Sequence, residues 1–236
     1  MKWYQKTYVW NFLDILFPPR CAGCEKWGGL ICNDCLKKII IISEPVCIRC
    51  GHPVQSYRIK CCDRCRSSVI YYDNIRSWAY FEGVLKKAIH RLKYCRDLGL
   101  SERLSIPMIL LLREQKWKVD KIIPVPLDPE RFRYRGYNQA ALLAKPISRN
   151  TGIAFDGDSL VRIHKTRSQV GLSEIERKEN VNNVFKANFS SIKGRSVLLI
   201  DDVITTGSTL NSCAKTLKKA EASRVYGLSP ARSLRL

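Results

Sequence analysis

The stretch Val197-Leu-Leu-Ile-Asp-Asp-Val-Ile-Thr-Thr-Gly-Ser-Thr-Leu210 decides the fold class of this chain of 236 residues. It opens with an uninterrupted apolar run, as expected for a strand buried on both faces of a sheet, and two carboxylates follow directly. A turn rich in hydroxyl groups comes next, and apolar residues then recur on one face of a helix expected over residues 208–220. Backbone N–H groups of such a turn and the positive helix end attract phosphate, and Gly207 permits close approach of the backbone.

Strand and helix patterns alternate over the rest of the C-terminal part. Strands are expected at residues 121–126, around 160–163, 185–187, 197–200 and 224–228. Helices are expected at residues 81–94, 102–114 despite Pro107, 138–148, 173–180 and 208–220, and Pro146 should kink or end the third of these. This alternation predicts an α/β fold with a mostly parallel sheet covered by helices.

Four Cys-x-x-Cys pairs stand in series in the first 65 residues. Two thiolates three residues apart can bind one ion from one side, and two such pairs complete a tetrahedron around Zn²⁺. Four pairs therefore predict two structural zinc sites, and sequential pairing is the simpler arrangement, although a crossed one is geometrically possible. Because thiolates fill every position, a catalytic zinc with an open coordination site is not expected. The expected ligands are Cys21, Cys24, Cys32, Cys35, Cys47, Cys50, Cys62 and Cys65.

Two neighbours of these pairs offer alternative ligands. Cys61 adjoins Cys62 and could replace it, and His52 could do the same after Cys50, although a lone histidine there is more often a surface residue. Buried or redox-active cysteines are the plainer explanation of such pairs, but their regular spacing in a reducing compartment disfavours it. A zinc ribbon can serve nucleic acids, protein partners or stability alone, and the spacing does not distinguish these roles.

The chain carries 41 Lys and Arg residues against 21 Asp and Glu residues, which gives a net charge of +20. Such an excess favours an anionic partner such as nucleic acid, a polyphosphate ligand or an acidic membrane surface. A basic surface that is only solvated would have the same composition. Charge alone therefore does not choose among these partners.

Residues 8–17 form a short apolar stretch near the N-terminus. It is too short to span a bilayer, contains Asp14 and lacks a small-residue cleavage site, so neither a transmembrane segment nor a secretory leader is expected. The protein is expected in the cytoplasm, with its thiols reduced or metallated. The stretch could dock peripherally on the inner membrane, but packing on its own domain is the simpler expectation. Cysteine content falls near residues 66–72, which predicts an N-terminal module over residues 1–67 and a second domain over 68–236.

The quoted segment resembles the phosphoribosyl-pyrophosphate signature of type I phosphoribosyltransferases. The resemblance implies that Asp201 and Asp202 hydrogen-bond the ribose 2- and 3-hydroxyls. It also implies that the 5-phosphate is cradled by Thr205, Thr206, Gly207, Ser208 and Thr209. The plainer alternative is that the two acids only cap the helix that follows. The hypoxanthine–guanine branch carries a further acid at the position of Thr205, so that substrate is less expected here.

A wider resemblance, to the ComF (late-competence) family, covers nearly the whole chain. In that family a double zinc ribbon precedes a phosphoribosyltransferase domain. Blocks at residues 92–97, 123–127, 131–139, 169–172 and 177–180 are similar to family blocks in the same order. The resemblance implies a role in natural transformation, in which incoming DNA crosses the inner membrane.

Pyrophosphate must be held and its departing charge neutralised, which requires Mg²⁺ and basic side chains. The candidate residues, each of which could equally be a solvated surface charge, are Lys93, Arg131, Arg135 and Arg177. Asn138 and Gln139 could instead cap the helix that they begin. Ala220 and Glu221 stand where relatives commonly carry a helix-ending glycine, so the end of that helix should differ.

Two functions compete on this sequence. The first is a phosphoribosyltransferase that displaces pyrophosphate from C1 of phosphoribosyl pyrophosphate with a nitrogen nucleophile, the acceptor being unidentified. The second is an accessory protein without turnover, whose zinc ribbons, basic charge and aromatic residues Trp27, Tyr57 and Tyr72 hold single-stranded DNA. The two are compatible, since a phosphoribosyl site could regulate or assist the DNA role. A scaffold that binds the ligand without catalysis is a third interpretation.

Overall fold

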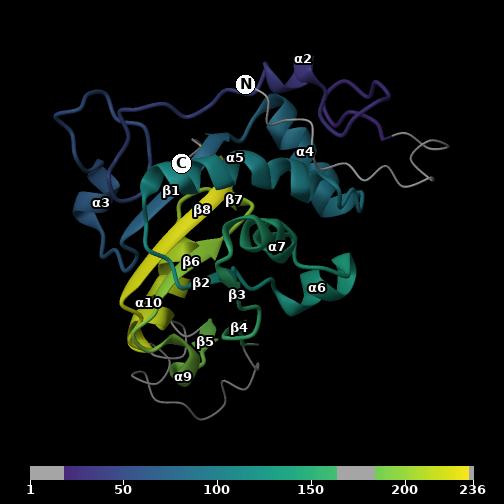
Figure 1. The fold of residues 1–236 in the computed structure, drawn as a ribbon. Coiled ribbons are helices and arrows are strands. Elements are labelled where there is room, and N and C mark those ends of the chain that lie inside the picture. The colour runs from purple at the N-terminus through teal and green to yellow at the C-terminus, as the bar shows by residue number, and fades with distance from the viewer. Residues whose placement is uncertain (1–18, 164–183, 234–236) are drawn as a thin grey trace, which may run out of the picture.

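The computed structural model describes residues 19–163 and 184–233, and a parallel sheet forms its centre. The strands run in the order β1 (Asn74–Tyr80), β8 (Arg224–Arg232), β6 (Ser196–Ile200), β2 (Lys121–Pro124) and β3 (Ala154–Phe155), with β7 (Val203–Ile204) also paired to β8. Every pairing in this sheet is parallel. The predicted α/β fold with a mostly parallel sheet is therefore confirmed (Figure 1).

Strand β6 is buried on both faces, as its apolar run predicts. Leu198 and Ile200 lie in the core on one face of the sheet, and Val197 and Leu199 lie in the core on the other. Helices supply the rest of both cores: α4 (Gly83–Tyr94), α5 (Leu100–Gln115) and α7 (Gln139–Thr151) on the first face, and α10 (Ser208–Lys219) on the second. The strand therefore ends between two helical layers, and the acid pair begins at that point.

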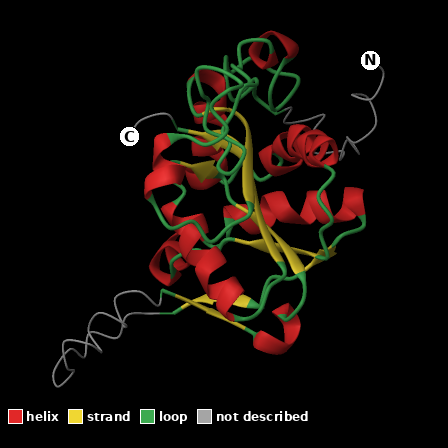
Figure 2. Cartoon of the chain, turned by 90° about the vertical axis from the view of Figure 1, so that its left-hand side faces the viewer, coloured by secondary structure: helices red, strands yellow, loops and turns green. Residues whose placement is uncertain are grey.

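Residues 19–67 form an N-terminal module made mostly of loops and turns (Figure 2). Its two short helices, α2 (Asn33–Leu36) and α3 (Asp63–Ser67), each begin directly after a cysteine. The module lies along edge strand β1, where the Ile42 N–H donates to the Trp78 carbonyl at 3.0 Å and the Ile75 N–H donates to the Arg49 carbonyl at 2.6 Å. These backbone hydrogen bonds fasten the module to the sheet.

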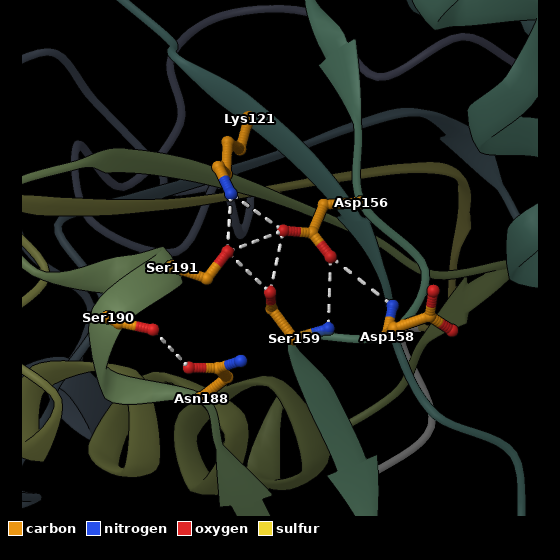
Figure 3. Close-up of polar contacts among 7 residues, drawn as sticks. All are labelled: Lys121, Asp156, Asp158, Ser159, Asn188, Ser190 and Ser191. Atoms are coloured by element: carbon orange, nitrogen blue, oxygen red, sulfur yellow. Dashed lines mark hydrogen bonds and ion pairs between the residues drawn. The ribbon is translucent and has the colours of Figure 1, made fainter.

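A polar cluster fastens a small antiparallel hairpin to the same sheet (Figure 3). The hairpin pairs β4 (Leu160–Arg162) with β5 (Phe185–Ala187), and α9 (Phe189–Ile192) follows it. Lys121 Nζ donates to a carboxylate oxygen of Asp156 at 2.8 Å, and the hydroxyls of Ser159 and Ser191 donate to the same oxygen at 2.6 and 3.0 Å. Burial opposes the charge on Asp156, but these hydrogen bonds outweigh burial and hold its pKa well below the usual range.

Helix α7 does not end early at Pro146, so that part of the expectation is wrong. The helix continues through Pro146 and ends only at Thr151. Proline removes one backbone hydrogen bond, but buried Leu143 and Ile147 lie on either side of it and hold the helix in the core shared with α5. Helix α5 likewise continues through Pro107, as the sequence predicts.

The sequence does not predict β1 or helix α6 (Pro129–Arg135). The expectation that the end of α10 should differ is wrong, because Glu221 takes the left-handed conformation that glycine usually adopts there, with φ of +61°. Its N–H donates to the Lys218 carbonyl and the Ala222 N–H donates to the Leu217 carbonyl, both at 3.0 Å, as in a glycine-terminated helix. The helix expected at residues 173–180 and the apolar stretch 8–17 lie outside the described residues. No helix in the described ranges is both long and apolar enough to cross a membrane.

Candidate functional site

The eight predicted cysteines gather in two clusters, and within each cluster all Sγ atoms lie within 4.8 Å of one another. Two Sγ–Sγ pairs lie 3.7 and 3.6 Å apart, Cys24 to Cys32 and Cys50 to Cys62. Four thiolates about 2.3 Å from a tetrahedral Zn²⁺ would lie about 3.8 Å apart, so both clusters fit structural zinc. The clusters are Cys21, Cys24, Cys32 and Cys35, and Cys47, Cys50, Cys62 and Cys65, which confirms sequential pairing.

Two glycines let the chain turn tightly at these clusters. Gly51 has φ of +68°, and a Cβ atom added there would lie 2.7 Å from a backbone carbonyl oxygen of β1. A Cβ atom on Gly23 would lie 2.6 Å from Sγ of Cys35. A larger residue would therefore push the second cluster away from β1 at Gly51, or displace a ligand of the first cluster at Gly23. Cys61 and His52, the alternative ligands, belong to neither of the two clusters that the described residues form.

The acid pair stands at the C-terminal end of β6. The Asp201 N–H donates to the Leu228 carbonyl on the neighbouring strand at 3.1 Å, and the Asp202 N–H donates to a carboxylate oxygen of Asp201 at 2.8 Å. Burial and the adjacent charge of Asp202 raise the pKa of Asp201 well above its usual range. Asp202 itself is only 3% exposed. The site thus holds two neighbouring carboxyl groups, and that of Asp202 is almost completely shielded from water.

Asp202 is held by residues from two helices. Lys93 of α4 forms an ion pair with one carboxylate oxygen, and the amide of Gln139, the first residue of α7, donates to the other at 3.1 Å. Arg135 of α6, which is also buried, donates to the side-chain oxygen of Gln139. Two of the basic residues expected at pyrophosphate, Lys93 and Arg135, are therefore joined to Asp202, directly or through Gln139.

Of the other two basic candidates, the structure places only Arg131, which takes no part in these contacts. Arg131 is exposed on α6, and Arg177 lies outside the described residues. Asn138 caps α7, since its side-chain oxygen accepts from the Ala140 N–H at 2.9 Å. Of the two expected capping residues, only Asn138 has that role, because Gln139 is bonded to Asp202.

The hydroxyl-rich turn lies open at the start of α10. Gly207 has φ of +75° and occupies the N-cap position, where it offers no side chain, and the Thr206 hydroxyl accepts from the Ser208 N–H at 3.3 Å. The alternative in which Asp201 and Asp202 only cap α10 is therefore wrong. The Thr206 and Ser208 hydroxyl oxygens lie 2.8 Å apart. The exposed side chains of the turn are those of Thr205, Thr206, Ser208 and Thr209.

Only two of the three aromatic residues named for base stacking are accessible. Trp27 and Tyr57 are 58% and 77% exposed on the N-terminal module. Tyr72 is only 4% exposed, so the expectation that it stacks on DNA is wrong. Its ring closes the core beneath the second cysteine cluster instead, and burial raises the pKa of its hydroxyl above the usual range.

A cavity of about 340 Å³, which the sequence does not reveal, lies between the turn and the second cysteine cluster. Thr205, Thr206 and Gly207 line one side, and cluster ligands Cys50 and Cys62 line another. Three arginines with no shared sequence motif also line it, namely Arg64, Arg66 and Arg232. The sequence gives no signal for this site because its residues come from three distant segments.

Hydrogen bonds fix helix α10, which follows the turn, to the segment that connects the N-terminal module to β1. The side chain of Asn211 in α10 accepts from the Tyr71 N–H at 2.8 Å and donates to the Val69 carbonyl at 2.9 Å. The Asn211 amide thus pairs with one backbone N–H and one carbonyl of the segment that leads from the second cluster to β1. The position of the turn is coupled in this way to the position of the cysteine module.

Known proteins match both parts of the chain. Residues 12–68 match the double zinc ribbon domain, and residues 138–226 match the phosphoribosyl transferase domain. The chain is 35% identical over 227 residues to Competence protein F of Haemophilus influenzae, covering 90% of this chain and 97% of that protein. It is 30% identical over 204 residues to DNA utilization protein YhgH of Escherichia coli K12, covering 84% and 88%. It is 29% identical over 242 residues to Competence protein ComFC of Bacillus subtilis, covering 98% and 92%.

Solved structures match at lower similarity. An adenine phosphoribosyltransferase has a TM-score of 0.38 and 21% identity, covering 59% of this chain and 72% of that one. A glutamine phosphoribosylpyrophosphate amidotransferase from Bacillus subtilis has a TM-score of 0.41 and 21% identity, covering 55% and 26%. The family is shown by sequence, because the similarity extends over nearly the full length of Competence protein F. With a double zinc ribbon ahead of a phosphoribosyl transferase domain, the chain belongs to the ComF family of competence proteins.

Proposed function

We propose that this protein binds phosphoribosyl pyrophosphate with Mg²⁺ and acts as a phosphoribosyltransferase in the service of DNA uptake during natural transformation. The proposal rests above all on the buried carboxylate of Asp202, which Lys93 and Gln139 hold directly ahead of an open, hydroxyl-rich turn. A charge fixed in position before a ligand arrives favours binding and catalysis. The names of the relatives, Competence protein F and DNA utilization protein, support the link to DNA uptake.

Each part of the site would hold one part of the ligand. Asp201 and Asp202 would accept hydrogen bonds from the two ribose hydroxyls. The turn Thr205–Thr209 and the first N–H groups of α10 would hold the 5-phosphate, as helix N-termini do for anions. Lys93 and Arg135 would act chiefly by positioning Asp202, and the exposed Arg131, together with Arg177, would meet the pyrophosphate.

The proposed reaction is a substitution at C1 of the ribose. The acceptor nitrogen forms a bond to C1 while the C1–O bond to pyrophosphate breaks, and the electron pair of that bond leaves with the pyrophosphate. The proton lost from the acceptor nitrogen passes to water. Mg²⁺ bound together with the ligand would supply positive charge that stabilises the leaving group. The protein contributes position and charge, which stabilise an oxocarbenium-like state.

The N-terminal module would have a structural role. We place its boundary between residues 67 and 68, because α3 ends at Ser67 and the chain then leads to β1, which begins at Asn74. Thiolates gathered for metal binding are typical of reducing compartments, so we place the protein in the cytoplasm. Peripheral contact with the inner membrane would bring it to the point where DNA enters.

Calorimetric titration of phosphoribosyl pyrophosphate with Mg²⁺ into zinc-replete protein tests the proposal. Wild type should bind, and the Asp201→Asn, Asp202→Asn double variant should lose binding because the ribose hydroxyls lose the carboxylate of Asp202 and the carboxyl group of Asp201 as acceptors. The Glu114→Ala, Glu130→Ala variant is the matched control, since it also removes two carboxylates, both exposed and on other helices. Thermal unfolding of each variant checks the fold. Equal binding by wild type and the Asn variant would overturn the assignment of the acid pair.

A second function, binding of single-stranded DNA without turnover, is favoured by the surface of the N-terminal module. The guanidinium of Arg20 lies 4.1 Å from the ring centre of exposed Trp27, and Tyr57 is more exposed still. An aromatic ring beside a basic group can stack on a base and meet its phosphate. The module would then hold DNA whether or not the phosphoribosyl site turns over.

Fluorescence titration of a thymidine oligonucleotide at two salt concentrations tests this second function. The Trp27→Ala, Tyr57→Ala variant should bind at least about tenfold more weakly than wild type, because each stacked base contributes on the order of 1–3 kcal/mol. Tyr134→Ala, which removes an exposed ring from α6, should bind like wild type. Unchanged affinity in the double variant would reject stacking, and a complex insensitive to salt would reject binding through charge.

A further inference from the structure

The cavity between the hydroxyl-rich turn and the second cysteine cluster has the size of a small-ligand site. Its volume of about 340 Å³ falls within the range of pockets that take small molecules, roughly 300–1,000 Å³. It lies outside the contacts that join Lys93 to Asp202, and neither residue lines it. The phosphoribosyl site and this cavity share only the wall formed by Thr205, Thr206 and Gly207.

A buried arginine faces this cavity with part of its hydrogen-bonding capacity unused. Arg232 is 3% exposed, and one of its terminal nitrogens donates to the carbonyl oxygen of Cys50. Its Nε has no hydrogen-bond partner among the described residues. Burial lowers the pKa of Arg232, but a guanidinium remains charged in proteins. A buried, incompletely paired cation is unfavourable unless a negative group comes close.

The charged side chains that line the cavity, apart from the cysteine ligands, are three arginines and one aspartate. Arg66 is paired with Asp63, the acidic residue among the lining side chains. Four thiolates around Zn²⁺ carry a net negative charge, which Arg232 partly balances through its place beside the second cluster. Arg64 is half-buried, forms no ion pair among the described residues, and lines both this cavity and the adjoining one of about 300 Å³. Arg64 is therefore a lining cation that no carboxylate of the described residues pairs with.

The remaining walls are apolar and suit a flat ring. Val54 and Ile59 come from the N-terminal module, and Ile75 comes from β1. The ring of Tyr72 completes this side, and its hydroxyl lies 3.9 Å from where a Cβ of Gly207 would stand. Apolar walls with a few placed polar groups are the usual composition of a site for a small organic molecule.

We infer that this cavity is the acceptor site of the proposed transferase and takes a small flat nitrogen heterocycle that carries an acidic group. The inference rests on the proposed function, because a transferase needs an acceptor beside the bound phosphoribosyl group. The acidic group lies against Arg64 and Arg232, the ring lies against the apolar walls, and a ring nitrogen faces C1 of the ribose, whose 5-phosphate is held by the shared wall of the turn. The apolar walls bind the ring, and the guanidinium of Arg64 favours an anionic acceptor over a neutral one of the same shape.

Two pairs of probes that differ in charge test the ligand class. Nicotinate is compared with nicotinamide, and orotate with uracil, by saturation-transfer NMR on full-length, zinc-replete protein with and without phosphoribosyl pyrophosphate and Mg²⁺. The anionic member of at least one pair should bind at least about tenfold more tightly, as hydrogen bonds to charged groups allow. Arg64→Ala should remove that preference and leave the affinity for phosphoribosyl pyrophosphate within about twofold. Arg113→Ala, which changes an exposed residue of α5, is the matched control.

The outcomes separate this inference from the proposed function. Equal binding of charged and neutral probes, or a preference that survives in Arg64→Ala, overturns the inference. A loss of phosphoribosyl pyrophosphate binding in Arg64→Ala also overturns it, because the cavity would then hold the 5-phosphate. Failure of wild type to bind phosphoribosyl pyrophosphate refutes the proposed function instead. The charge preference and its loss in Arg64→Ala would still decide the chemical class of ligand that the cavity takes.

Discussion

The ammonium group of Lys93 forms an ion pair with the carboxylate of Asp202, and the two side chains are only 21% and 5% exposed. The pair joins the last turn of α4 to the end of β6 across the core. Removing charges from water is unfavourable, and their mutual attraction compensates only when both partners are present. The acid pair is therefore held in place by a group more than a hundred residues earlier in the chain.

Replacing Lys93 by Met should lower the free energy of unfolding by about 3 kcal/mol, because the buried charge of Asp202 loses its partner. Chemical denaturation measures this change. The Lys93→Met, Asp202→Asn double variant should recover part of the stability, since no unpaired charge remains. Lys86→Met, on the exposed side of the same helix, is the control. A double variant less stable than Lys93→Met would contradict the ion-pair explanation.

Acid should destabilise the protein in part through Asp156. Its pKa is held below the usual range, so its contribution to stability is complete above the unfolded pKa of about 3.9 and is lost as pH falls through the folded pKa. Asp156→Asn should lower stability at pH 7 by on the order of 2 kcal/mol. Thermal unfolding of both proteins between pH 7 and pH 2 checks this. The difference between them should shrink in acid, and a constant difference would contradict the prediction; comparing the two proteins removes the common effect of zinc loss.

Loss of the second zinc should affect the phosphoribosyl site more than loss of the first. Arg232, which donates to the Cys50 carbonyl, pairs through its strand with Ile204 at the start of the turn. Cys50→Ser should therefore lose one zinc and weaken phosphoribosyl pyrophosphate binding, whereas Cys24→Ser should lose one zinc with little change in binding. Metal analysis and calorimetry measure both effects. Cys61→Ser should keep both zinc ions, and weaker binding in Cys24→Ser alone would contradict the coupling.

The left-handed conformation at the turn gives a further prediction. Gly207→Ala should destabilise the fold by about 1 kcal/mol, because φ of +75° is unfavourable for a residue with a Cβ atom. The strained turn should also bind phosphoribosyl pyrophosphate at least about tenfold more weakly, since the N–H groups shift. Gly152→Ala is matched, with φ of +73° and open space around it at the end of α7. Equal binding by both variants would show that the turn conformation does not matter.

The parts of the molecule that the sequence predicts are those with local signals. The apolar run of β6, the turn and α10 are contiguous, and the cysteine pairs are regularly spaced. Strand β1 lacks such a signal, because its inward positions Ile75, Ser77 and Ala79 include a hydroxyl and a small side chain. Ser77 is buried because its hydroxyl lies 2.8 Å from that of Ser229 on β8, a partner that no local pattern reveals.

At other places the local sequence supports two different structures. Asp128 and Pro129 are a typical helix start, and the Asp128 side chain does accept from the Glu130 N–H at 3.0 Å, yet the many arginines of α6 suggest a binding segment instead. Pro146 is a helix breaker by local chemistry, but packing of α7 overrides it. Arg232 and its partner Cys50 lie 182 residues apart, so only the folded chain brings them together.

The place of β8 in the sheet has a consequence for the newborn chain. β8 lies between β1 and β6 although it follows both in the sequence, and 152 residues separate Ser77 from its partner Ser229. On the ribosome, β1 must wait without its neighbour until residues 224–232 have been made, a state in which unpaired strands aggregate or recruit chaperones. The cysteine module is complete at Cys65 and bonds to β1 through Ile42 and Arg49, so a metal-loaded module can already cover the outer edge of the waiting strand. Zinc supply would thereby govern the yield of folded protein during translation, before it affects the finished molecule.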